Sequence, residues 1–139
     1  MFACDRMSLL RRADLPTPVP GASIDDAPLT GRWRNADDHA AAPAIREVEL
    51  IREQGRAARV RMIGVDGFDW GEVAIEQVFA GSPSASTAVG FTASFALADR
   101  RARIQANIKL GVMVLAGFMD FDRGRAPTFT RDFCHPEER

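Results

Sequence analysis

The sequence predicts an all-β protein, an antiparallel up-and-down barrel of about eight strands that follows an extended N-terminal arm. From Gly31 onward the chain consists of short runs of alternating apolar and polar residues, separated at short intervals by residues that favour turns. No helical period of useful length lies between these runs, which disfavours folds that alternate strands with helices. A chain of 139 residues is one domain by length. We therefore expect an arm over residues 1–30 and a barrel over residues 31–139.

Turn residues separate the expected strands. Asp66-Gly67 is typical of a hairpin turn, Gly111 marks another turn, and residues 122–125 turn the chain once more. The clearest alternation lies in residues 87–98. The eight expected strands cover residues 32–35, 44–52, 56–65, 70–80, 87–98, 103–110, 112–121 and 128–134.

The alternation also predicts which side chains face the interior of the barrel, because the more apolar face of each strand should point inward. By the same alternation, Asp120 and Arg131 are expected to face inward near one end. The expected inward sets are Val73, Ile75, Gln77 and Phe79; Val89, Phe91, Ala93, Phe95 and Leu97; Ile104, Ala106 and Ile108; and Val112, Val114, Ala116 and Phe118.

The outward face of residues 112–121 would then expose Met113, Leu115, Met119 and Phe121. An exposed apolar stripe of this kind marks an interface, so we predict a homodimer, or a larger assembly, joined through this outer face. The alternative is that the N-terminal arm covers the stripe within one chain. The arm is rich in proline over residues 15–21, which predicts an extended chain. Leu9 and Leu10 either begin a short helix or belong to a segment without regular structure.

Charge and composition argue against several classes of protein. The formal net charge is -1 and the pI is near 6.1, whereas a nucleic-acid-binding protein usually has a strong basic excess. No stretch approaches the ~20 apolar residues that a membrane span needs, and residues 1–13 lack the apolar region of a secretory signal. We therefore expect a cytoplasmic protein with no nucleic-acid partner and no membrane partner.

The two cysteines, Cys4 and Cys134, lie near opposite ends of the chain. A disulfide between them would need an oxidising compartment, so free thiols are the favoured interpretation. No spacing of cysteine and histidine suits zinc, and we expect no metal and no cofactor. His39 lies in an expected exposed loop. Cys134 and His135 are adjacent on a strand and point to opposite faces, so they should not form a thiol–imidazole pair.

Gly31-Arg32-Trp33 opens the first expected strand, and Arg131 lies on the last one. This arrangement resembles the lipocalins and the wider calycin group. The resemblance implies that Trp33 packs across the closed end of the barrel against Arg131, where stacking adds a cation–π term, and that both residues are structural. Over residues 31 to 134 the chain also resembles a group of small bacterial barrel proteins of uncharacterised function, in residues 31–35, 69–72, 118–124 and 130–133.

A few polar groups in an apolar cavity are typical of a small-molecule site. Gln77, Asp120 and Arg131 are the candidates for orienting a ligand, unless Asp120 and Arg131 pair with each other, because an unpaired buried charge is costly. Residues 66–71 form either a second site or, in the favoured interpretation, a hairpin turn. The predicted ligand-binding residues are Gln77, Phe79, Phe91, Phe95, Phe118, Asp120 and Arg131.

The sequence thus predicts a protein that binds a small hydrophobic or amphipathic molecule in a barrel cavity. The alternative is a cyclase or isomerase acting on a small apolar biosynthetic intermediate, because such catalysis needs only shape, orientation and one or two polar groups. A desolvated, unpaired Asp120 would favour that alternative. The sequence contains no catalytic motif, so no catalytic residue is named. A third hypothesis is a scaffold protein whose barrel is filled by side chains.

Overall fold

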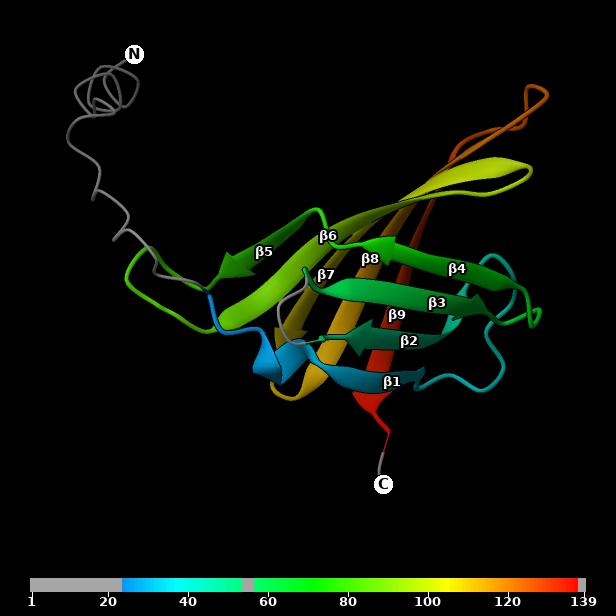
Figure 1. The fold of residues 1–139 in the computed structure, drawn as a ribbon. Coiled ribbons are helices and arrows are strands. Elements are labelled where there is room, and N and C mark those ends of the chain that lie inside the picture. The colour runs from blue at the N-terminus through cyan, green and yellow to red at the C-terminus, as the bar shows by residue number, and fades with distance from the viewer. Residues whose placement is uncertain (1–23, 54–56, 138–139) are drawn as a thin grey trace, which may run out of the picture.

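A computed structural model describes residues 24–53 and 57–137 of the chain. Its strands form one strongly curled antiparallel sheet with the shape of half a barrel (Figure 1), which confirms the predicted all-β class. A short 3-10 helix, η2 (Ala27–Leu29), precedes the sheet. The described strands are β1 (Gly31–Asn35), β2 (Ile45–Ile51), β3 (Arg59–Gly64), β4 (Asp69–Ala74), β5 (Gln77–Ala80), β6 (Ala88–Ala96), β7 (Arg100–Lys109), β8 (Val112–Phe121) and β9 (Thr128–Pro136).

The sheet does not close on itself, because one expected strand is divided between two partners. We predicted a single strand over residues 70–80, but β4 and β5 lie at opposite ends of the strand order β4-β3-β2-β1-β9-β8-β7-β6-β5. The Ile75 amide donates to the Ala58 carbonyl beside β3, whereas the Glu76 amide donates to the Thr92 carbonyl in β6. The chain therefore changes its partner strand from β3 to β6 between Ile75 and Glu76. The predicted closed barrel of eight strands is wrong.

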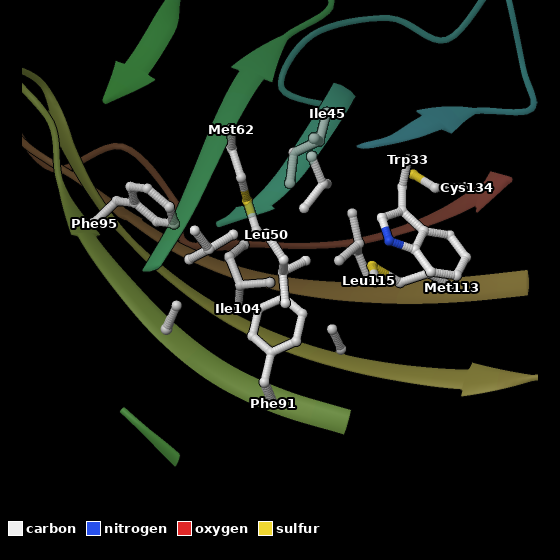
Figure 2. Close-up of a cluster of buried hydrophobic side chains, with 14 of the residues drawn as sticks. Trp33, Ile45, Leu50, Met62, Phe91, Phe95, Ile104, Met113, Leu115 and Cys134 are labelled. Carbon is white, nitrogen blue, oxygen red and sulfur yellow. The ribbon is translucent and has the colours of Figure 1, made fainter. Parts of the chain in front are cut away.

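The concave side of the sheet is filled with side chains. Trp33, Leu50 and Met62 of β1, β2 and β3 are at most 4% exposed, and Phe91 and Leu115 meet them from β6 and β8. Figure 2 shows these side chains gathered in the space between the two halves of the sheet. Removal of this apolar surface from water is the main favourable contribution to folding. The space between the described strands is therefore occupied by the hydrophobic core.

The inward face of β8 is the reverse of the predicted one. A two-residue turn at Leu110-Gly111 sets its register: both residues have positive φ, 53° and 78°, as in the type I′ turns that join paired strands. The turn places Lys109 opposite Val112, and directly opposed residues point to the same face. Because Lys109 is exposed, Val112 and every second residue after it face outward. Met113, Leu115 and Met119 are buried, while Val112, Val114, Ala116, Phe118 and Asp120 lie on the outer face.

The division between β4 and β5 also changes the phase of the alternation. Ile75 and Val78 both pack against the core, so Gln77 and Phe79, which we expected inside, are exposed. Val89 is exposed as well, at 37%. The expected inward positions of Phe91, Ala93, Phe95, Ile104 and Ala106 are confirmed by burial, and Val73, Ile75, Leu97 and Ile108 pack partly buried against the core.

Residues 24–30, the described part of the predicted arm, lie against the sheet. Leu29 is fully buried, and its carbonyl accepts a hydrogen bond of 2.9 Å from the indole nitrogen of Trp33. This bond satisfies the one polar atom of a buried tryptophan. Residues 1–23, which include Cys4, the proline-rich run and both leucines of the expected short helix, lie outside the described residues.

We expect Gly90→Ala to destabilise the fold, because β6 and β7 approach closely at this residue. A Cβ at Gly90 would lie 2.4 Å from the backbone oxygen of Ala106, and that oxygen belongs to the paired hairpin. The free energy of unfolding should fall by about 1–3 kcal/mol in urea denaturation followed by circular dichroism. Gly81→Ala is the matched control, since its Cβ would meet nothing nearer than a Val89 methyl group at 3.6 Å. Equal stability of the two variants would contradict this account.

Candidate functional site

The predicted ligand-binding residues do not converge in the interior. Phe91 and Phe95 are buried in the core, at 1% and 2% exposure. The structure brings three of the predicted residues, Phe95, Phe118 and Asp120, to one hollow at the outer surface. The remaining residues lie apart from it on the outside of the sheet: Gln77 and Phe79 on β5, and Arg131 on β9.

This hollow has a volume of about 490 Å³ and crosses the outer face of β6, β7 and β8; we call it the outer groove. The sheet register builds it, because opposed residues in antiparallel strands point to the same face. One row of opposed residues is Ser94, Arg103 and Phe118, and the next is Ala96, Arg101 and Asp120. The groove is lined by these six residues together with Phe95 and Ala102.

Phe118 provides an aromatic surface in the outer groove. The guanidinium carbon of Arg103 lies 5.3 Å from the centre of its ring, within the range of a cation–π contact. Phe118 also packs against Phe129 of β9, with ring centres 5.1 Å apart. These contacts hold a cation beside an apolar ring, which is the combination that a ligand with an apolar body and a negative group requires.

Among the described residues, the arginines of the outer groove have no carboxylate partner. Neither Arg101 nor Arg103 forms an ion pair within the part of the chain that the structure describes. Their guanidinium groups therefore remain available to an added anion. The outer face of β1 to β4 differs, since three of its arginines form ion pairs: Arg32 with Glu49 at 2.7 Å, Arg59 with Glu72 at 2.8 Å, and Arg61 with Asp69.

Asp120 and Arg131 both face outward, contrary to our expectation, and they do not pair with each other. Asp120 lies opposite Arg101 on β7 and is exposed. Arg131 lies opposite Ala116, further along β8. The guanidinium carbon of Arg131 is 6.0 Å from the ring centre of Phe129. Asp120 therefore belongs to the outer groove, and Arg131 lies outside it.

The contact between Trp33 and Arg131 that the lipocalin resemblance implied is not formed. Trp33 is buried in the core, whereas Arg131 is exposed on the other face of the sheet. An arginine stacks on a tryptophan elsewhere, because Arg100 lies over the ring of Trp70 at 5.4 Å. Trp70 also meets Phe95 edge to face, with ring centres 5.5 Å apart. This cluster covers the core between β4 and the end of β6.

Residues 66–71 belong to the β3–β4 hairpin, whose turn ends where β4 begins at Asp69, as in the interpretation that we favoured over a second site. The Asp66 carboxylate accepts a hydrogen bond of 3.0 Å from the Phe68 amide. The hydrogen bond from Arg61 holds the pKa of Asp69 below its ordinary value. Both carboxylates of the turn thus have local partners.

A buried carboxylate that the sequence analysis missed, Asp132, joins three strands. One of its oxygens accepts a hydrogen bond of 3.1 Å from the Asn35 side-chain amide, and the other accepts one of 3.1 Å from the backbone N–H of Ile45. The Asn35 amide also donates to the Ile45 carbonyl at 2.7 Å. A signal was available, because Asp132 occupies an inward position in the alternation of β9, and buried polar groups need partners.

The surroundings of Asp132 indicate a structural role for this residue. Burial raises its pKa, and the hydrogen bonds from Ile45 and Asn35 oppose that rise. Both carboxylate oxygens already accept bonds from the protein, so we assign Asp132 the role of holding β9, β1 and β2 together. A hollow of about 520 Å³ lies beside it, lined by Asn35, Ala36, Asp37, Ala40, Arg131, Asp132 and Phe133.

Cys134 has a free thiol in the core. Burial, followed by the negative charge of Asp132, raises its pKa to about 12, so the thiol stays protonated at neutral pH and is a poor nucleophile. His135 is exposed on the other face of β9, which confirms that the two do not form a catalytic pair. Within the described ranges, no three His, Cys, Asp or Glu side chains gather to hold a metal ion.

The outer face of β8 and β9 has an apolar surface, but its residues differ from those we predicted. Phe129 and Phe133 of β9 are 56% and 48% exposed, beside the partly exposed Val114 and Phe118. The predicted stripe of Met113, Leu115 and Met119 lies in the core instead, and Phe121 is partly buried. A homodimer through the outer face of residues 112–121 stays a prediction, with this different set of residues.

No family model matches the chain, and neither a curated protein nor a solved structure matches it. The resemblance to lipocalins and to small bacterial barrels therefore stays a prediction. Among the described residues, none of the helices has the length and apolar character needed to cross a membrane.

We expect Asp132→Asn to change how stability depends on pH. Because the pKa of Asp132 is raised in the folded protein, the folded state binds this proton more tightly than the unfolded chain does. The wild type therefore loses a contribution to stability as the pH rises from below 3.8 through the raised value, and the variant lacks this loss. Urea denaturation across the range from about pH 3 to pH 7 measures both proteins.

The stability of the wild type minus that of Asp132→Asn should be largest at the acidic end and should shrink as the pH rises. Asp69, whose pKa is lowered, acts in the opposite direction, but it is present in both proteins and cancels in the difference. Asp38→Asn, in an exposed loop, is the control. A difference that stays constant with pH would contradict a raised pKa of Asp132.

Proposed function

We propose that this protein binds a small amphipathic anion in the outer groove, a molecule with an apolar or aromatic body and a carboxylate, sulfate or similar group. One observation carries the proposal: the Arg103 guanidinium lies over the Phe118 ring, and neither Arg103 nor Arg101 forms an ion pair within the described residues. The aromatic ring would contact the body of the ligand, and the guanidinium groups would bind its anion.

The chemistry of arginine supports this choice. A guanidinium can bind a carboxylate through two parallel hydrogen bonds and can stack on an aromatic ring at the same time. The volume of the groove, about 490 Å³, falls within the usual range of small-molecule sites, roughly 300–1,000 Å³. Because the groove is open to solvent, added salt should weaken binding.

The proposal keeps an amphipathic small molecule as the ligand but moves it from the interior to the outer face. A desolvated Asp120 would have favoured the cyclase or isomerase alternative, and Asp120 is exposed, so no observation favours that alternative. The filled interior meets the expectation of the scaffold hypothesis. A scaffold whose outer groove binds no small molecule is therefore the result that would replace this proposal.

Anilinonaphthalene sulfonate, an anion whose fluorescence rises in apolar surroundings, is a suitable probe. Neutral N-phenylnaphthylamine has the same rings without the sulfonate and is the control ligand. We expect Arg103→Gln to weaken binding of the sulfonate about threefold to tenfold and to leave the neutral probe unchanged. Asp120→Asn should strengthen binding of the sulfonate about twofold, because it removes a like charge. Fluorescence titration measures each Kd.

Arg34→Gln is the matched control variant. Arg34 is exposed on the outer face of β1, outside the groove, and forms no ion pair within the described part of the chain. It should therefore leave the Kd of the sulfonate unchanged, while circular dichroism checks that every variant is folded. The proposal fails if Arg34→Gln and Arg103→Gln weaken binding equally, or if neither groove variant changes it.

A further inference from the structure

β6 extends beyond its partner strand at one edge of the sheet. β5 pairs with β6 from Ala80 opposite Ala88 to Gln77 opposite Thr92, whereas β6 continues to Ala96. The last part of β6, residues 93–96, pairs with β7 on one side and with no described strand on the other. This part of β6 is therefore an open strand edge.

The backbone groups on this edge belong to Ser94 and Ala96. The Thr92 carbonyl accepts a hydrogen bond from the Glu76 amide on the side away from β7. Alternate residues of an antiparallel strand direct their N–H and C=O groups to the same side. Ser94 and Ala96 therefore also direct their backbone groups away from β7, toward the open edge. Unpaired backbone groups of this kind are a template for an additional strand.

β4 lies near β6 but forms no backbone pairing with it. Figure 1 shows β4 and the β6–β7 hairpin diverging from the point where the chain passes from β4 to β5, and among the described strands β4 pairs with β3 alone. Trp70 and Phe95 lie between the two strands in edge-to-face contact. The core is thus closed by side chains at this place, while the backbone edge of β6 remains unpaired.

The open edge lies next to the arginines of the outer groove. Arg103 is opposite Ser94 and Arg101 is opposite Ala96, one strand further from the edge. Ser94 and Ala96 have small side chains on the outer face, so they leave space above β6. An arginine of β7 and a long acidic side chain on an added strand can meet over these two small residues.

We propose that the ligand of the outer groove is an extended acidic peptide segment, which adds as a further strand to β6 at Ser94 and Ala96. This inference rests on the proposed function, because it identifies the anion as a carboxylate side chain of a peptide. Its outward acidic side chains bind Arg101 and Arg103, and its inward side chains, against Trp70 and Phe95, are small and apolar. In strand addition, main-chain hydrogen bonds supply affinity and alternate side chains supply specificity.

Two carboxylates near the edge restrict where an acidic side chain can lie. Glu76 accepts a hydrogen bond of 2.8 Å from the Ser94 hydroxyl, so like charge disfavours an acidic side chain beside Ser94. Asp120 lies opposite Arg101 on β8, which is one strand further from the edge than β7. The position beside Ala96, where Arg101 and Arg103 can both be reached, is therefore the preferred place for the carboxylate.

The test uses a short acetylated and amidated peptide of alternating valine and glutamate. Its lysine counterpart tests charge. Two further versions carry N-methyl groups on the backbone nitrogens of either the valines or the glutamates. In an added strand, only the valine N–H groups or only the glutamate N–H groups can point toward β6. The parent peptide should bind and slow the hydrogen exchange of the Ser94 and Ala96 amides. One methylated peptide should bind at least about tenfold more weakly, and the other should bind like the parent.

The outcomes separate this inference from the proposed function. Equal loss of binding in both methylated peptides, or in neither, overturns strand addition, as does equal binding of the lysine peptide. If anilinonaphthalene sulfonate binds in the groove while the peptide leaves the Ser94 and Ala96 amides unprotected, the inference fails and the proposed function stands. If neither ligand binds, both fail. Protection of these amides without peptide, together with a dimer in sedimentation, would identify a second copy as the occupant and overturn the inference.

Discussion

The change of partner strand at Ile75 and Glu76 determines the shape of the described fold. One continuous segment pairs first with β3 and then with β6, so it forms both ends of the strand order. The sheet can curl far enough for its two halves to share a core, but its edges separate on either side of this point. Trp70, Phe95 and Arg100 then cover with side chains a place that a closed barrel would cover with backbone pairing.

Because apolar side chains fill the concave side of the sheet, most polar side chains lie on its outer face. The two halves of the sheet differ in how the arginines on this outer face are partnered. On β1 to β4 the arginines Arg32, Arg59 and Arg61 form ion pairs with neighbouring carboxylates. On β7 to β9 the arginines Arg103 and Arg131 lie over phenylalanine rings instead. Exposed ion pairs add little stability, so the difference matters more for binding than for folding. It is the reason to look for a ligand on the second face.

The types of residue in the candidate site could be predicted from the sequence, but their location could not. Phe118 and Asp120 were selected as ligand-binding residues on the assumption that they face inward, and they line the outer groove instead. The error began in β8, which is apolar on both faces. The short turn at Leu110-Gly111 requires Val112 to share the face of Lys109, so applying that constraint would have reversed the assignment. Arg101 and Arg103 were not among the predicted ligand-binding residues.

The alternation of apolar and polar residues by itself determined the all-β class, the positions of most strands and the burial of Phe91, Phe95 and Ile104. These are local properties, because a period of two residues and a turn signal are read within a few positions of the chain. Only the tertiary structure decided which strands pair beyond Ile75 and that Asp132 joins β9 to Asn35 and Ile45. Each of those contacts joins residues far apart in the sequence, and their pairing depends on how all the strands share one core.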